Sequence, residues 1–236
     1  MTLIHPTVKA FSFDAGGTLI RPTPSVGDIY AEILAEFGIS AEPAVLNARF
    51  KTAFREIRSI PIEPCNATTE RLLWEETVRR TFGPVCPPPA QFTPIFEALY
   101  ATFQEGRRWR IYPDVMPALE NLKARGYRMV ILSNNDSRLR PLLDDLGLLR
   151  FMEDVFISCE IGVPKPNRRA FDHVAKAMDL PPETLLHIGD DLQKDGIGAR
   201  DAGWQSALVR QRLPPPADIT TFATLKDLTN ALTVNE

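Results

Sequence analysis

The chain has 236 residues, which is enough for one large domain or for one domain with an inserted cap. Its hydrophobic content of 44% and charged content of 24% are ordinary for a globular protein, and no apolar run reaches the length of a membrane span. With a net charge of -3 as well, we expect a protein that binds neither membrane nor nucleic acid.

The first predicted element is an apolar strand from Val8 to Phe13, and Asp14 follows directly after it. A strand that ends this way places its carboxylate at the carboxyl edge of the sheet, where open α/β sheets bind ligands. The next residues are Ala15, Gly16 and Gly17, whose successive N–H groups form a concave nest for an anion. The stretch predicts a phosphate site beside Asp14, although an aspartate that only caps a turn leaves the same pattern.

Four helices and no strand are predicted from about residue 25 to residue 104. Ser25 is expected to cap the first helix, with Asp28 three residues later in the manner of a capping box. Thr69 is expected to cap the third helix, and Thr93–Pro94 to open the fourth.

Two polar stretches mark where this helical segment joins the rest of the chain. Residues 21–25 are rich in proline, and residues 107–110 carry three arginines. We therefore predict a helical cap over residues 21–106, inserted into a core formed by residues 1–20 and 107–236.

The second predicted helix carries the basic residues Lys51, Arg55 and Arg58 on one face and aromatic residues on another. Such a stripe is typical of a solvated helix face, although it would also attract an anionic substrate.

From Tyr112 onward helices and strands alternate, which predicts an α/β fold with a Rossmann-like, mostly parallel sheet and helices on both faces. The predicted elements are a helix at 117–125, a strand at 128–132, a helix at 137–146, a strand at 154–158, a helix at 166–178, a strand at 185–188, a helix at 194–202, a strand at 206–209 and, after a break at 214–216, a helix at 225–232.

Two further candidate binding residues follow this pattern. Ser133 ends an apolar strand just before a helix, so that its hydroxyl and the free helix N–H groups form an anion site, with Asn134 placed to orient a substrate. Lys165 lies between Pro164 and Pro166, which restrict its backbone. We expect Ser133 to contact phosphoryl oxygens and Lys165 to supply positive charge where the Asp14 carboxylate approaches a phosphate.

Asp190 ends another apolar strand and is expected to meet Asp14 across the edge of the sheet. Carboxylates gathered in this way repel one another unless a cation lies between them. Oxygen ligands without a nearby histidine or cysteine cluster favour Mg²⁺. His187 lies inside the same apolar strand and is expected to be a core histidine with its hydrogen bonds satisfied, and not a metal ligand.

Taken in order, these stretches resemble the four motifs of the haloacid dehalogenase-like (HAD) hydrolase superfamily, in the branch with a helical cap after the first motif. Residues 13–33 resemble, more loosely, the rhythmically-expressed-gene-two-like subgroup. The matching stretches are residues 13–19, 129–136, 162–166 and 185–195.

The resemblance implies a catalytic role for several of these side chains. Asp14 is the nucleophile and forms an aspartyl-phosphate. Lys165 holds the nucleophile and the phosphoryl oxygens, Ser133 binds the same oxygens, and Thr18 donates a hydrogen bond nearby.

The resemblance also implies the ligands of the metal. Mg²⁺ is bound by Asp14, by Asp190 and by the backbone carbonyl of Gly16, while Asp195 lies in the outer shell and orients the lysine and metal-bound waters. Asp191 is either part of this acidic cluster or the cap of the next helix.

One departure from the family pattern leaves the function open. The first motif of the family is Asp-x-Asp-Gly-Thr, and Gly16 replaces its second aspartate, the general acid/base. That group is typically worth roughly 10²–10⁴-fold in rate. The first interpretation is a slow or selective Mg²⁺-dependent phosphatase that acts on small phosphorylated metabolites with good leaving groups.

A second interpretation is a phosphonatase or a dehalogenase, since these relatives also lack the second aspartate. Metal-free dehalogenases lack the acidic last motif, however, and phosphonatases use a cap lysine, for which Lys51 is the sole candidate. A third interpretation is a phosphate-binding or scaffold protein without turnover.

The three cysteines are odd in number and widely spaced, which is typical of reduced thiols. The first strand begins too near the N-terminus to leave room for a signal peptide. We therefore expect a cytoplasmic monomer or homodimer whose partner is a small phosphorylated molecule.

Overall fold

The computed structural model describes residue 4 and residues 7–60, 63–211 and 219–232. The chain divides into two compact units, one comprising Met1–Arg21 with Ile111–Glu236 and the other Pro22–Arg110. We refer to them as the sheet unit and the helical unit.

The sheet unit is built on six strands in the order β5–β4–β1–β6–β7–β8, and every neighbouring pair is parallel. The predicted α/β fold with a parallel sheet is therefore confirmed. The strands are β1 (Ala10–Phe13), β4 (Arg128–Ser133), β5 (Asp154–Ile157), β6 (Leu185–Gly189), β7 (Gln205–Val209) and β8 (Thr220–Phe222).

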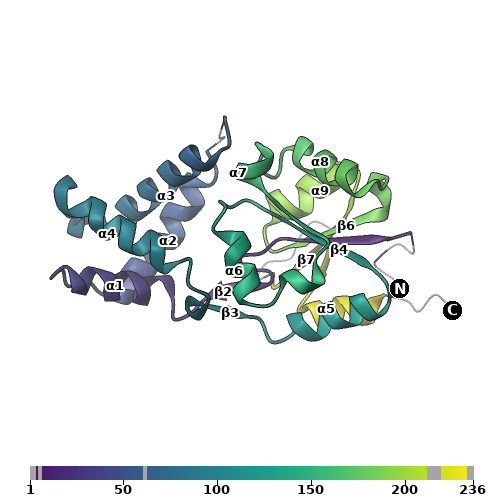
Figure 1. Ribbon diagram of the computed structural model, residues 1–236, viewed down its shortest axis with the longest axis horizontal. Coiled ribbons are helices and arrows are strands. Elements are labelled where there is room, and N and C mark those ends of the chain that lie inside the picture. Colours follow the sequence, from purple (N-terminus) through teal and green to yellow (C-terminus); the bar gives the residue numbers. More distant parts are fainter. Residues whose placement is uncertain (1–3, 5–6, 61–62, 212–218, 233–236) are drawn as a thin grey trace. The chain divides into compact units, whose positions relative to one another are not determined.

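Helices cover both faces of this sheet, which is why its central strands are apolar along most of their length. In Figure 1, α8 (Arg168–Met178) and α9 (Gly198–Asp201) lie on one side, while α5 (Val115–Ala124) packs with the yellow α10 (Leu225–Ala231) on the other. The remaining helical segments are α6 (Leu139–Asp145), α7 (Ser158–Ile161), a π-helical turn η5 (Leu192–Ile197) and short 3₁₀ turns at Leu149–Phe151 and Pro182–Thr184.

Several predicted boundaries in the sheet unit are wrong. Helix α8 begins at Arg168 and not at Pro166, because the Asn167 side chain accepts a hydrogen bond from the Arg169 N–H at 3.0 Å and caps the helix. The segment predicted as one helix at 194–202 is η5 followed by α9. Strand β8 was not predicted because three residues are too few to show an alternation, and the predicted break at 214–216 lies outside the described residues.

Four helices form the helical unit: α1 (Val26–Glu36), α2 (Pro43–Ile57), α3 (Ala67–Phe82) and α4 (Pro89–Thr102). Tyr30 of α1 lies at their centre, with its ring edge-on to the rings of Phe50, Phe82 and Phe103. A Cβ at Gly27 would lie 2.1 Å from the Pro43 carbonyl oxygen, so glycine allows α1 and α2 to approach closely. A 3₁₀ turn (Gly83–Val85) follows α3.

The predicted capping box at Ser25 is confirmed: its Oγ accepts from the Asp28 N–H at 3.3 Å, and Asp28 accepts from the Ser25 N–H at 3.0 Å. The prediction for the third helix is wrong, because Asn66 is the cap and Thr69 is its partner three residues later. Helix α4 also begins a turn earlier than predicted, since Pro89 already suits the first helical position and Pro94 lies inside the helix.

The basic stripe on α2 is not one solvated face. Lys51 and Arg55 are exposed, but the Arg58 side chain is only 6% exposed and pairs with the fully buried Glu70 at 2.6 Å. The Arg58 guanidinium also lies 4.8 Å from the centre of the Trp74 ring. Arg58 is therefore part of the interior of the helical unit.

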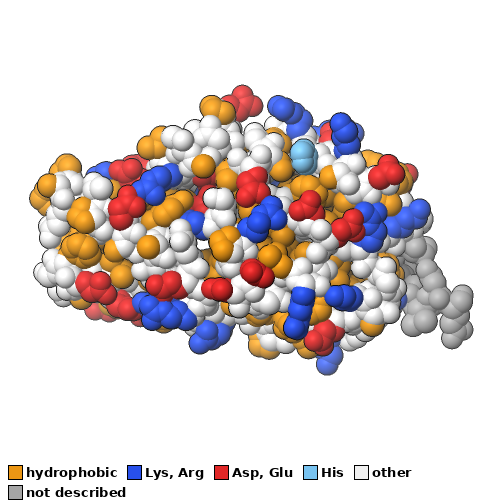
Figure 2. Space-filling view, viewed as in Figure 1, with side chains coloured by type: hydrophobic (Ala, Val, Ile, Leu, Met, Phe, Trp, Pro, Cys, Tyr) orange, Lys and Arg blue, Asp and Glu red, His pale blue; other side chains and the backbone are white. Residues whose placement is uncertain are grey.

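Two short strands, β2 (Ile20–Pro22) and β3 (Trp109–Ile111), pair with each other where the chain passes between the units, and a 3₁₀ turn (Gly106–Arg108) precedes β3. None of the described helices is both long and apolar enough to cross a membrane. On the face shown in Figure 2, acidic and basic side chains are intermixed, as expected for a chain with a net charge of -3.

Candidate active site

The topology of the sheet brings three predicted site residues to one edge. Phe13 of β1 pairs with residue 131 of β4 on one side and with residue 188 of β6 on the other. Asp14, Ser133 and Asp190 stand at or just beyond the carboxyl ends of these three strands. The chain leaves β1 toward β4 and leaves β6 toward β7, so the β1–β6 boundary is a topological switch point, where open sheets of this kind bind ligands.

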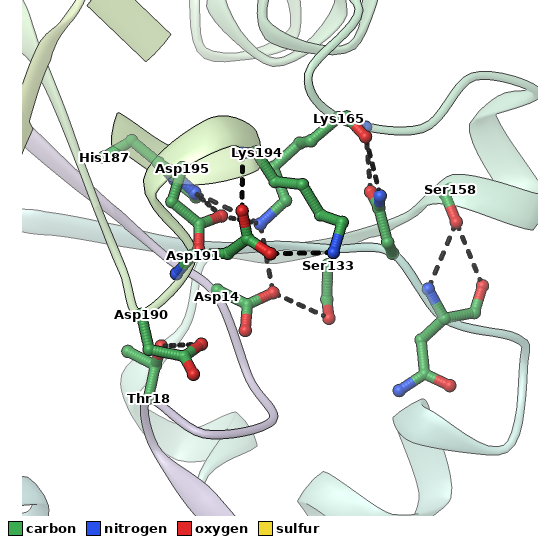
Figure 3. A network of polar contacts seen from close by, with 12 residues as sticks. Asp14, Thr18, Ser133, Ser158, Lys165, His187, Asp190, Asp191, Lys194 and Asp195 are labelled. Carbon is green, nitrogen blue, oxygen red and sulfur yellow. Dashed lines mark hydrogen bonds and ion pairs between the residues drawn. The ribbon is translucent and has the colours of Figure 1, made fainter. Parts of the chain in front are cut away.

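Asp14 lies at the centre of the cluster in Figure 3. Its Oδ1 accepts hydrogen bonds from Ser133 Oγ at 3.1 Å and from Lys165 Nζ at 3.0 Å. Within the described part of the chain, Oδ2 has no hydrogen-bond donor, so this oxygen remains available to a metal ion. Burial raises the pKa of Asp14, and the positive charge of Lys165 opposes that rise.

Lys165 comes from the loop before α8, and its side chain is only 1% exposed. Besides Asp14, its Nζ contacts Asp195 Oδ1 at 2.6 Å and His187 Nε2 at 3.2 Å. Burial alone would lower the pKa of this ammonium, but the charges of Asp14 and Asp195 outweigh burial and raise the pKa. The lysine therefore stays charged at neutral pH.

Asn134, predicted to orient the substrate, holds the backbone of Lys165. Its Nδ2 donates to the Lys165 carbonyl and its Oδ1 accepts from the Lys165 N–H, both at 2.8 Å. The next residue is fixed in turn, because the Asn135 N–H donates to Ser158 Oγ at 3.1 Å. The amide of Asn134 thus positions the lysine.

Asp190 faces the loop after β1. Thr18 Oγ1 donates to Asp190 Oδ1 at 3.4 Å, a weak contact (Figure 3). Gly17 has a φ of +86°, and a Cβ there would lie 2.4 Å from Asp190 Oδ2, so only glycine fits. Burial, together with the negative charges of Asp14 and Asp195, raises the pKa of Asp190 to about 7.

The predicted phosphate nest is smaller than expected. The Gly17 N–H donates to the Ile20 carbonyl at 2.8 Å, inside its own loop, and is therefore not available to an anion. The N–H groups of Ala15 and Gly16 have no acceptor among the described residues. Gly16 itself is exposed, and a Cβ at this position would meet no atom within 4 Å.

Asp195 lies in η5 beneath the end of β6. Its Oδ1 accepts from Lys165 and its Oδ2 accepts from the Asp191 N–H at 2.9 Å. A Cβ at Gly189 would lie 2.0 Å from Asp195 Oδ2, so glycine makes room for this carboxylate. Burial alone would raise the pKa of Asp195, but the charge of Lys165 dominates and lowers it. Asp191 caps η5, since its side chain accepts from the N–H groups of the second and third residues after it.

Asp14, Asp190 and Asp195 each offer a carboxylate oxygen, and these oxygens lie within 4.8 Å of one another. Both oxygens of Asp195 already accept hydrogen bonds, whereas the Asp190 carboxylate has, among the described residues, only the long contact from Thr18. Burial and, after it, repulsion from the neighbouring carboxylates raise the pKa of Asp190, and a divalent cation would relieve that repulsion. An all-oxygen donor set suits Mg²⁺. The residues therefore fit this ion, which Asp14 and Asp190 would bind directly.

His187 is fully buried, as predicted for a core histidine, and its Nδ1 lies 2.9 Å from Ser12 Oγ. Burial, followed by the charge of Lys165, lowers the pKa of His187 to about 4, so that the ring is neutral. Sequence reasoning missed its contacts with Lys165 and Asp195. It also missed Gln211, whose side-chain amide donates to the carbonyl oxygen of Asp190.

Known proteins share both the sequence pattern and the fold. The chain is 31% identical over 205 residues to the human "Haloacid dehalogenase-like hydrolase domain-containing protein 3", covering 86% of this chain and 82% of that protein. It is 27% identical to a phosphoserine phosphatase of Thermus thermophilus, covering 88% and 91% of the two chains.

Among solved structures, the putative HAD-hydrolase YfnB of Bacillus subtilis, bound to magnesium, matches with a TM-score of 0.78 at 19% identity, over 96% of this chain and 99% of that one. The family model described as haloacid dehalogenase-like hydrolase matches residues 8–203. The chain therefore belongs to the haloacid dehalogenase-like hydrolases.

Proposed function

We propose that this protein is a Mg²⁺-dependent phosphatase that acts on a small phosphorylated metabolite through an aspartyl-phosphate intermediate. The observation that carries the proposal is the partly buried Asp14 carboxylate, which contacts both the Lys165 ammonium and the Ser133 hydroxyl beside Asp190. The similarity to a protein named phosphoserine phosphatase agrees with it.

In the first step, Asp14 attacks phosphorus, the bond from phosphorus to the leaving oxygen breaks, and an aspartyl-phosphate forms. The positive charge of Lys165 and the hydroxyl of Ser133 stabilise the phosphoryl oxygens, together with the N–H groups of the loop after β1. When bound by Asp14, Asp190 and the Gly16 carbonyl, Mg²⁺ would offset the repulsion between carboxylate and phosphate.

The second aspartate of the first motif is Gly16 here, so residue 16 offers no proton to the departing oxygen. Asp195 is ionised and both of its oxygens are engaged, and Lys165 already donates to two carboxylates. We therefore expect substrates whose leaving group departs without protonation, such as aryl or acyl phosphates. We also expect slow hydrolysis of the phosphoenzyme, because no carboxylate at residue 16 activates the attacking water.

We further propose that the helical unit acts as a cap, corresponding to the predicted segment 21–106, and that it selects the substrate. We place the protein in the cytoplasm, in agreement with three cysteines that form no disulfide with one another.

The test is turnover of 4-nitrophenyl phosphate with Mg²⁺ and with excess chelator, together with the intact mass of the protein after mixing. Asp14→Asn should abolish turnover and phosphoenzyme, because an amide does not form the acyl phosphate. Lys51→Ala is the matched control and should retain activity, since only a phosphonatase needs that lysine for an imine. A wild-type protein with neither turnover nor phosphoenzyme would contradict the proposal.

A further inference from the structure

We propose that His187 is a positioning residue: its neutral imidazole accepts the third N–H of Lys165 and thereby holds the ammonium against Asp14. The kinetic consequences rest on the phosphatase function proposed above. The hydrogen-bond arrangement itself is a property of the resting protein.

Strand register places this histidine. His187 of β6 pairs with Ser12 of the neighbouring strand β1, and Ser12 stands two residues before Asp14. Because residues two apart on a strand share a face, Ser12 and Asp14 point to the same side of the sheet. His187 therefore extends toward the side from which Lys165 reaches Asp14, and both its ring and the Ser12 side chain are fully buried.

The Lys165 ammonium has three N–H donors and no acceptor. In the described part of the chain, its three polar neighbours are Asp14 Oδ1 at 3.0 Å, Asp195 Oδ1 at 2.6 Å and His187 Nε2 at 3.2 Å. At 1% exposure the lysine side chain is closed to water, so these neighbours have to satisfy it. Two are carboxylates, and His187 completes the set.

The number of N–H donors on Lys165 determines which nitrogen of the His187 imidazole carries the proton. If Nε2 accepts from Lys165, then Nδ1 carries the proton and donates to Ser12 Oγ at 2.9 Å. The other tautomer would donate from Nε2 to Asp195 Oδ1 at 3.1 Å and would leave a buried ammonium N–H facing an imidazole N–H. Asp195 Oδ1 already accepts the short bond from Lys165, so the first tautomer satisfies more of the buried donors.

Different substitutions can change the packing of the His187 imidazole and its hydrogen bonds separately. The His187 ring lies edge-on to Phe171 with ring centres 5.5 Å apart, and Phe171 is not one of the three polar partners named above for Lys165. Phe171→Leu therefore changes the packing around the imidazole and leaves its nitrogen atoms in place. His187→Leu removes both nitrogens, whereas His187→Gln keeps an amide oxygen that accepts from Lys165.

The first experiment compares kcat and KM for 4-nitrophenyl phosphate in these variants. His187→Leu should lower kcat by about 10–100-fold, the usual effect of losing an outer partner of a site, with little change in KM. His187→Gln should restore most of kcat, and Phe171→Leu should lower the melting temperature while leaving kcat nearly unchanged. Equal kcat in wild type and His187→Leu, or a Gln variant as slow as Leu, would overturn the inference.

The second experiment needs no turnover. ¹⁵N NMR of histidine-labelled protein, with the His187 signals assigned by their loss in His187→Gln, should show Nδ1 protonated and Nε2 unprotonated. A protonated Nε2 would overturn the inference even if the protein is an active phosphatase. A protein with the expected tautomer and no turnover in any variant would instead refute the phosphatase function alone. In that case the readout is the Mg²⁺-dependent affinity for orthovanadate, a mimic of the phosphoryl group in transfer. A weaker affinity in His187→Leu would support the positioning role of His187, and an unchanged affinity would refute that role.

Discussion

Replacing Gly16 with aspartate tests whether the site lacks a proton donor for the leaving group. A Cβ at Gly16 meets no atom within 4 Å, and the backbone there is not left-handed, so the new side chain enters open space in the loop after Asp14. Gly17 offers no such room, because its φ is +86° and a Cβ would overlap Asp190. Residue 16 therefore accepts a Cβ without rearrangement of the loop.

The size of the gain follows from the chemistry of the leaving oxygen. General acid catalysis is typically worth 10²–10⁴-fold, or about 3–5 kcal/mol of activation free energy. An alkoxide leaving group needs the full contribution of the general acid because it is a strong base, whereas a nitrophenolate departs without a proton. Gly16→Asp should therefore raise kcat/KM for alkyl phosphates by roughly 10²-fold or more and change that for nitrophenyl phosphate by less than about threefold.

The assay is kcat/KM for a series of phosphate esters graded by the pKa of the leaving alcohol. Wild type should depend steeply on that pKa, and Gly16→Asp should depend on it weakly. Gly16→Asn is the matched control, since it has the same size and no carboxyl proton. A wild-type rate independent of leaving-group pKa, or an Asn variant that gains as much as Asp, would show that another group donates the proton.

Three further outcomes are expected. Mg²⁺ affinity, measured by calorimetry, should fall about tenfold per pH unit below pH 7, because Asp190, whose pKa is raised to about 7, must release a proton before the ion binds. An affinity that does not change with pH would contradict this expectation. Gly17→Ala should lower both the melting temperature and the Mg²⁺ affinity, and an unchanged affinity would mean that Asp190 is not a ligand. Glu70→Ala should cost about 3–5 kcal/mol in urea unfolding by leaving the buried Arg58 unpaired, and Arg58→Met in the same protein should recover part of that loss.

The place of the site could be predicted because it depends on strand ends alone. Asp14, Ser133 and Asp190 each come at the end of an apolar run, and parallel strands end at the same edge of a sheet. The confirmed parallel pairing of β1 with β4 and β6 is sufficient to bring them together, although Ser133 lies 119 residues after Asp14 and Asp190 lies still farther along the sequence.

Element boundaries were harder to predict because neighbouring residues compete for the same role. Asn66 and Thr69 both carry a side-chain oxygen that can cap α3, and only the local backbone decides that Asn66 is the cap. Near α8 the competition is between Pro166, suited to a first helical position, and Asn167, whose side chain accepts the Arg169 N–H. Sequence pattern gives both candidates equal support.

His187 shows a different limit of pattern reading. Apolar neighbours on both sides correctly predict a buried core residue, but burial does not reveal what the two ring nitrogens contact. Its partners Ser12 and Lys165 are 175 and 22 residues away in the sequence, and only the β1–β6 register brings Ser12 opposite. Counting donors supplies the missing step. A lysine closed to water requires three acceptors, two of them are the motif carboxylates, and the third has to be another buried polar group, for which His187 is placed.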